Sequence, residues 1–179
     1  MVPVSPLELR VLRAGVVRRV LDAKRLPTIA THYLMVNLPS DSLALLAGLD
    51  VGQEVDPVDA RELLLDVLSE LGQPIDEHRE VELVAMLFAK SHTQAIVPAR
   101  QTCRRFYRLG VEIGYEWPLA QIGELFGFDD EWEASWGRTP AQLCEATAAA
   151  CEELLRTTEP MLGVLDNAAV SRLSEMVIS

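Results

Sequence analysis

The chain has 179 residues, 49% of them hydrophobic, and carries 27 acidic against 16 basic side chains, a net charge of −11. A chain of this length buries roughly 70% of its unfolded surface, so we expect one globular domain, residues 1–179, that folds without a disulfide or a metal ion. The net charge argues against binding to nucleic acid, because neutralisation of phosphates supplies most of that affinity.

The cysteines and the first residues indicate where the protein acts. The three cysteines are an odd number, and the start of the chain lacks the basic and apolar regions of a signal peptide. Both features are typical of the reducing cytoplasm. The longest uncharged run, residues 26–40, is shorter than the about 20 apolar residues that span a bilayer. We therefore expect a cytoplasmic protein that does not enter the membrane.

Prolines, glycines and capping residues divide the chain into segments with apolar residues at helical spacing. The helical segments predicted in chain order are 6–25, 28–38, 41–48, 57–71, 77–96, 98–113, 118–126 and 140–156, followed by two short helices that begin at Pro160 and Asn167. Asp76 is the predicted cap of the fifth segment, and an acidic, aromatic stretch, residues 128–136, follows the seventh.

Two capping boxes mark helix starts, one from Ser5 to Glu8 and one from Thr139 to Gln142. Sustained alternation of polar and apolar residues, which is typical of strands, does not occur in the sequence. The predicted fold class is therefore all-α, a single-domain irregular bundle of about eight helices with essentially no sheet.

The charge is distributed in blocks of alternating sign. Residues 1–25 carry a balance of +4, residues 41–82 a balance of −10, residues 83–111 a balance of +5 and residues 112–179 a balance of −10. Such blocks can complement one another across helix contacts, either within one chain or between two copies of it.

The sequence contains no pattern typical of a metal site or a catalytic site. The histidines, His32, His78 and His92, are far apart and belong to no zinc or di-iron motif, so we predict no metal and no cofactor. No nucleophile, base and orienting group recur at a recognisable spacing, so no catalytic residue is predicted and a non-enzymatic protein is favoured.

The cysteines lie at positions where core residues are expected. Cys144 and Cys151 share the apolar part of one predicted helix, and Cys103 falls on the apolar face of another. We expect these thiols to be small core residues rather than nucleophiles, because a reactive thiol needs a basic, partly exposed surrounding.

Arginines spaced four apart form a stripe on the segment 98–113. Arg100, Arg104 and Arg108 share one face opposite the apolar face, and Arg105 flanks them. Arg108 can pair with Glu112 four residues further on, but the other arginines have no acid at that spacing. Their charges must be neutralised by acids on a neighbouring helix or second subunit, or by an anionic ligand such as a phosphate or carboxylate. The candidate anion-binding residues are Lys90, His92, Arg100, Arg104, Tyr107 and Arg108.

The segment 118–127, followed by Phe128 and later by Thr139 and Pro140, resembles the helix-turn-helix half of AraC-type transcription regulators. This resemblance implies a DNA-recognition helix after the Gly-Phe turn. The residues at that place, 129–133, are mostly acidic and would repel phosphates, so we expect no binding of nucleic acid through this element.

Three functions remain open. The first is a regulatory or interaction protein that self-associates as a homodimer through its complementary charge blocks, with Trp132 and Trp136 as candidate partner contacts. The second is an inhibitor of the immunity-protein or antitoxin type, whose acidic face covers a basic protein partner. The third is a binder of, or enzyme for, a small anionic ligand held by the arginine stripe, for which a pocket between Arg100 and Arg108 would be the distinguishing feature.

Overall fold

The fold is all-α, and we describe it from a computed structural model over residues 4–49, 55–73, 79–134 and 137–178. Within these ranges the chain forms the following helices: α1 (Pro6–Val17), the short 3₁₀ helix η1 (Ala23–Arg25), α2 (Leu26–Met35), α3 (Asp41–Gly48), α4 (Pro57–Glu70), α5 (Glu80–Thr93), α6 (Ala99–Glu112), α7 (Ala120–Glu133), α8 (Pro140–Leu162) and α9 (Asn167–Glu175).

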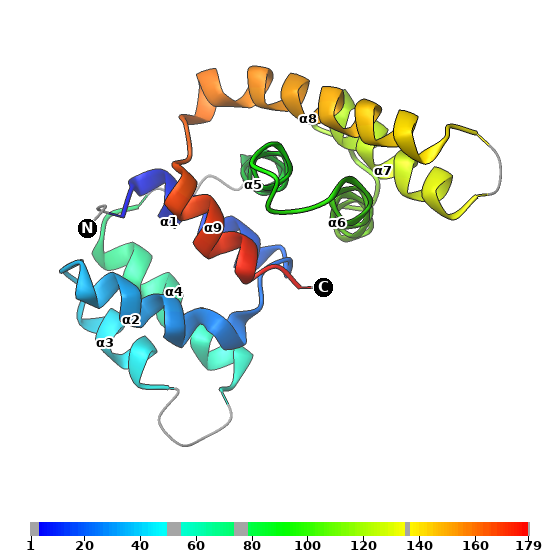
Figure 1. Ribbon diagram of the computed structural model, residues 1–179. Helices are drawn as coiled ribbons and strands as arrows, with labels where there is room; N and C mark the ends of the chain where they lie inside the picture. The colour runs from blue at the N-terminus through cyan, green and yellow to red at the C-terminus, as the bar shows by residue number, and fades with distance from the viewer. Residues whose placement is uncertain (1–3, 50–54, 74–78, 135–136, 179) are drawn as a thin grey trace.

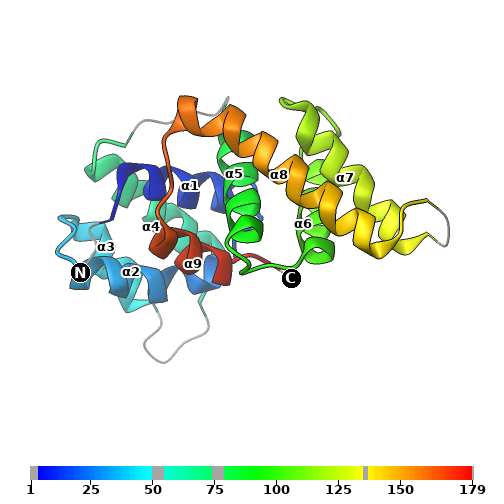
Figure 2. The same cartoon turned by 45° about the horizontal axis from the view of Figure 1, so that its top comes forward.

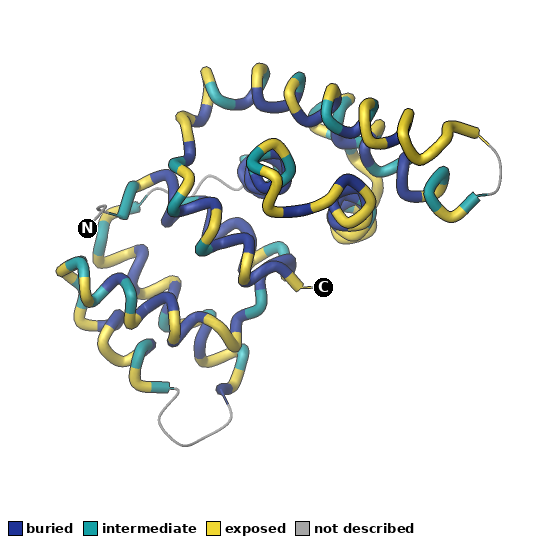
Figure 3. The backbone as a smooth tube through the Cα atoms, viewed as in Figure 1, coloured by how far each residue is buried: buried dark blue, intermediate teal, exposed yellow. Residues whose placement is uncertain are grey.

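Helix α5 lies at the centre of the molecule. It packs against α1, α6, α8 and α9, and its residues from Leu83 to Ala89 are all buried. Figure 1 shows α1–α4 on one side of α5 and α6 and α7 on the other, and Figure 2 shows α8 crossing α5 and α6. The buried faces of the helices point inwards (Figure 3) and contribute to one hydrophobic core.

Three predicted start signals act as expected, whereas the segment predicted from residue 118 begins at Ala120 without a side-chain cap. The Ser40 hydroxyl accepts a hydrogen bond from the Leu43 amide, the Asp56 carboxylate accepts one from the Val58 amide, and Thr139 and Gln142 form a capping box. Each satisfies a backbone donor that a helix N-terminus leaves open. The predicted cap at Asp76 lies outside the described residues.

The first helix is shorter than predicted. It was expected to reach residue 25, but α1 ends at Val17, and the chain reverses at Arg19, whose φ is 54°. The reversal is possible because Gly15 has no side chain. A Cβ at Gly15 would lie only 2.4 Å from Cγ of Leu21, which packs in that space. The second helix begins earlier than the predicted residue 28, because Pro27 lies in the first turn of α2.

The C-terminal segment joins this reversal. Leu21 and Val177 form an isolated antiparallel bridge, the Asp22 amide donates to the Met176 carbonyl (2.8 Å), and the Ile178 amide donates to the Val20 carbonyl (3.0 Å). The bridge is the only β pairing in the described part of the chain, so the prediction of essentially no sheet is confirmed.

Two later boundaries and one cysteine also differ from prediction. Helix α7 continues through the acidic stretch to Glu133, because Asp129 and Glu133 pair with arginines of α6. Helix α8 extends to Leu162, and Pro160 lies in its last turn instead of starting a new helix. Cys144, expected in the core, is exposed, whereas Cys103 and Cys151 are buried as predicted.

A buried ionic cluster connects α1, α2 and α9. The carboxylate of Glu8, 0% exposed, accepts hydrogen bonds from Nε and Nη2 of Arg172 (2.9 and 2.8 Å) and from the Tyr33 hydroxyl (2.9 Å). Ser5 caps α1 as predicted by accepting from the Glu8 amide. The Glu8 carboxylate that the capping box would employ is turned inwards, where it pairs with the partly buried Arg172.

The Tyr33 phenol should make stability fall at alkaline pH. Burial, and then the charge and the hydrogen bond of Glu8, raise the pKa of Tyr33 well above its usual value. Its stabilising contribution is therefore complete below the unfolded pKa of about 10 and is lost as the pH rises towards the folded pKa. Urea unfolding near neutral pH and above about pH 10 should show a smaller alkaline loss in Tyr33→Phe than in the wild type. The exposed Tyr115→Phe is the control, and equal alkaline losses in all three proteins would contradict the prediction.

Candidate functional site

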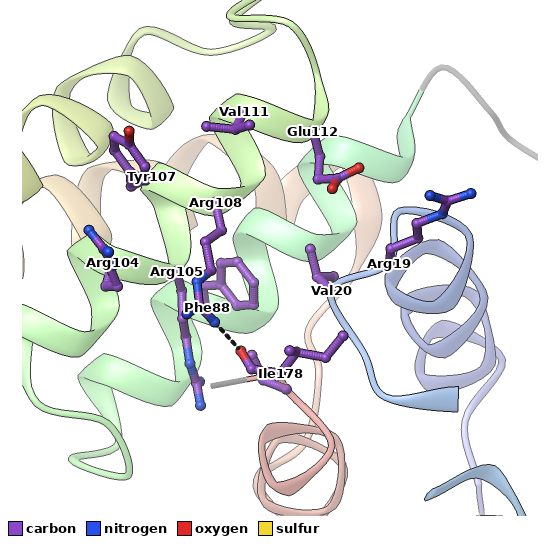
Figure 4. A pocket seen from close by; sticks show the side chains of 11 residues that line it. Arg19, Val20, Phe88, Arg104, Arg105, Tyr107, Arg108, Val111, Glu112 and Ile178 are labelled. Carbon is purple, nitrogen blue, oxygen red and sulfur yellow. Dashed lines mark hydrogen bonds between the residues drawn. The ribbon is translucent and has the colours of Figure 1, made fainter. Parts of the chain in front are cut away.

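Three of the four arginines of α6, Arg104, Arg105 and Arg108, line a pocket between α6, α5, the reversal after α1 and the C-terminal segment (Figure 4). Its volume is about 420 Å³. The charged residues of its lining are Arg19, Arg104, Arg105, Arg108 and Glu112. The other lining residues are Tyr107, Val20, Phe88, Val111, Val177 and Ile178. We call it the α6 pocket. It carries four guanidinium groups and one carboxylate, so it is basic in an otherwise acidic protein.

Arg105 is the most deeply placed charge of the α6 pocket. The residue is 8% exposed, and its guanidinium lies 5.8 Å from the ring centre of Phe88. Its Nη2 donates a long hydrogen bond of 3.5 Å to the Ser174 carbonyl, and its Nη1 finds no acceptor among the described residues. Burial lowers the pKa of Arg105 to about 10. This cation is thus desolvated without a carboxylate from the described chain beside it.

Arg104 and Arg108 differ in how their charges are balanced. Nη1 of Arg104 lies 2.7 Å from the Asp129 carboxylate, and this hydrogen bond raises the pKa of Arg104. Nη1 of the exposed Arg108 donates to the Ile178 carbonyl (3.0 Å), a neutral acceptor. Figure 4 shows this bond beside the pocket, with Arg104 and Tyr107 on the side away from Arg19 and Glu112. The charge of Arg104 is therefore neutralised, whereas Arg108 forms neither the expected ion pair with Glu112 nor one with any other carboxylate of the described residues.

Half of the predicted anion-binding residues lie together. Arg104, Tyr107 and Arg108 line the α6 pocket. The other three lie outside its lining: Lys90 pairs with Glu159 of α8 (2.5 Å), His92 shares a hydrogen bond with the Val97 carbonyl (3.0 Å), and Arg100 pairs with Glu133 (2.6 Å). Trp132, a candidate partner contact, is partly buried against the core, and Trp136 lies outside the described residues.

The sequence-based reasoning missed most of the pocket's other residues. Arg19, Phe88 and the C-terminal residues Val177 and Ile178 come from distant parts of the chain, and no local pattern connects them. The sequence did contain an indication that Arg105 faces inwards. It follows the buried Thr102 by three residues and precedes the buried Leu109 by four, so helical spacing places it on the inner face of α6.

The alternating charge blocks contact one another within the chain. The first basic block meets the first acidic block at Glu80, a buried carboxylate that accepts hydrogen bonds from Arg13 (2.7 Å) and Arg18 (3.0 Å). The second basic block meets the second acidic block through Lys90 with Glu159, Arg100 with Glu133 and Arg104 with Asp129. These intramolecular pairs account for much of the complementarity in the sequence.

A second pocket of about 400 Å³ lies between α2 and α9 and contains Arg25, His32, Arg172 and Glu175 in its lining. Its charges are better balanced than those of the α6 pocket. Glu8 neutralises Arg172, and the lining also contains the negative charge of Glu175 against that of Arg25, which donates to the Glu175 carbonyl. The second pocket therefore attracts an anion less strongly than the α6 pocket does.

Neither a metal site nor a membrane-spanning helix occurs within the described ranges. No group of three or more His, Cys, Asp or Glu side chains is arranged to hold a metal ion, and none of the helices is both long and apolar enough to cross a bilayer. Comparison of the sequence with models of known protein families gives no match, and neither does comparison with curated proteins or with solved structures.

Proposed function

We propose that this chain binds a small anion in the α6 pocket. The observation that carries the proposal is Arg105, a guanidinium that is nine-tenths buried and whose only described hydrogen bond is a long one to a carbonyl. An isolated buried charge costs several kcal/mol, and an anion beside it removes much of that cost. The pocket next to Arg105 provides the space for such a partner.

Other groups of the α6 pocket also favour a negatively charged ligand. Arg108 adds a second guanidinium whose charge is not neutralised, and guanidinium forks match carboxylates and phosphates in geometry. The part of the lining that the structure describes contains no histidine and no thiol, the groups that most often act as base or nucleophile. We therefore propose binding rather than catalysis.

The other two functions stay predictions with less support. Self-association is less needed to neutralise the basic blocks, because Arg100, Arg104 and Lys90 already have acidic partners within the chain. Inhibition of a basic protein partner rests only on the net charge of −11. A cytoplasmic location and a homodimer are likewise predictions from the sequence.

The proposal can be tested with anilinonaphthalene sulfonate, an aromatic monoanion whose fluorescence reports binding. Arg108→Gln removes a charge-assisted donor, and we expect the dissociation constant to rise about tenfold or more. Arg100→Gln is the matched control, because it removes the same charge from an exposed position of the same helix, outside the α6 pocket. Equal affinities of the two variants and the wild type, or no binding at all, would overturn the proposal.

A further inference from the structure

The walls of the α6 pocket are apolar, which restricts the kind of anion that fits. Phe88 and Val177 are buried at its base, whereas Val111 and Ile178 are 48% and 45% exposed beside it. In Figure 4, Val111 and Ile178 lie on opposite sides of Arg108. Exposed apolar side chains on both sides of an uncompensated cation are typical of a site for a molecule that is apolar and anionic at once.

The charge that the α6 pocket can neutralise is small. Arg104 is paired with Asp129, and Arg19 lies at the Glu112 end of the pocket (Figure 4), so Arg105 and Arg108 are the guanidinium groups left on α6 to balance a ligand. Glu112 is also part of the lining and would repel a ligand with several negative charges. A polyphosphate would place more charge beside apolar walls than these groups can offset, and the uncompensated part would lose its hydration.

We infer that the ligand of the α6 pocket is a monocarboxylic acid with an apolar body. This inference rests on the proposed function and specifies its ligand. The carboxylate lies between Arg105 and Arg108 and accepts hydrogen bonds from their free N–H groups. The apolar body covers Val111 and Ile178 and removes their exposed surface from water.

The inference is tested by competition, with bound anilinonaphthalene sulfonate as the reporter and octanoate, acetate, octanol and inorganic phosphate as competitors. Octanoate should displace the reporter at concentrations at least about tenfold below those of acetate, since each buried CH₂ strengthens binding several-fold. Octanol lacks the charge and should compete about tenfold less well than octanoate. Phosphate should compete no better than acetate.

A pair of variants examines the apolar wall directly. Val111→Asp places a negative charge beside the ligand body, and we expect it to weaken octanoate binding about tenfold. Val164→Asp is the control, because Val164 is also exposed and lies outside the α6 pocket. Equal octanoate affinities of the two variants would overturn the inference.

The outcomes separate the inference from the proposed function. If the reporter binds with the expected dependence on Arg108 but phosphate displaces it as well as or better than octanoate, the α6 pocket binds anions and the ligand class is wrong. The same holds if octanol competes as well as octanoate. If reporter binding does not depend on Arg108, the proposed function fails and the inference fails with it.

Discussion

Replacing Arg172 by methionine is expected to lower the free energy of unfolding by about 3–5 kcal/mol. Arg172 is the bidentate partner of Glu8, whose carboxylate has no contact with solvent. Methionine keeps much of the side-chain volume of Arg172 but removes its charge. The Glu8 carboxylate then stays buried, with the Tyr33 hydroxyl as its only remaining donor among the described side chains. Chemical denaturation of the variant and the wild type at neutral pH measures the difference.

A surface pair provides the control for this variant. Arg156 pairs with Glu153 on the exposed side of α8, and exposed ion pairs contribute about 0–1 kcal/mol. Arg156→Met should therefore change stability little. The double variant Glu8→Gln with Arg172→Met removes both charges and should recover part of the loss. Equal losses in Arg172→Met and Arg156→Met would show that the cluster around Glu8 is not a buried ion pair.

The second large effect is expected where α5 and α6 meet. Phe106 of α6 is fully buried and packs edge-to-face against Phe88 of α5, with ring centres 5.6 Å apart. Phe106→Ala opens a cavity beneath the α6 pocket and should lower the free energy of unfolding by about 3–5 kcal/mol. Denaturant titration tests this value, with Leu45→Ala, a truncation at an exposed position of α3, as the control that should cost about 0.5 kcal/mol or less. Similar losses for both variants would contradict the packing described here.

The starts of the helices were predicted more accurately than their ends. The starts of α3, α4 and α8 depend on short-range signals, a capping side chain followed by a suitable first turn, and these were recognised correctly. The ends of α1 and α7 depend on distant groups. Leu21 packs on Gly15 to end α1, and pairing of Glu133 with Arg100 holds the last turn of α7. Such contacts have no counterpart in the local sequence.

The same division applies to the candidate site. Arginines spaced four apart predicted a basic stripe on α6, and this face contributes Arg104 and Arg108 to the α6 pocket. Which arginine keeps an unbalanced charge could not be predicted, because it depends on the position of α7. Asp129 of α7 reaches Arg104, whereas Arg108 and Arg105 reach carbonyl groups of the C-terminal segment.

By itself, the sequence determined the all-α class, the capped helix starts and the basic face of α6, because each follows from side-chain spacing within a few turns of one helix. Only the tertiary structure decided that Glu8 is buried against Arg172 and Glu80 between two arginines, that α1 stops at Val17 and that Arg105 is enclosed. These features depend on groups far apart in the chain, since burial and charge compensation are properties of the packed molecule and not of any one segment.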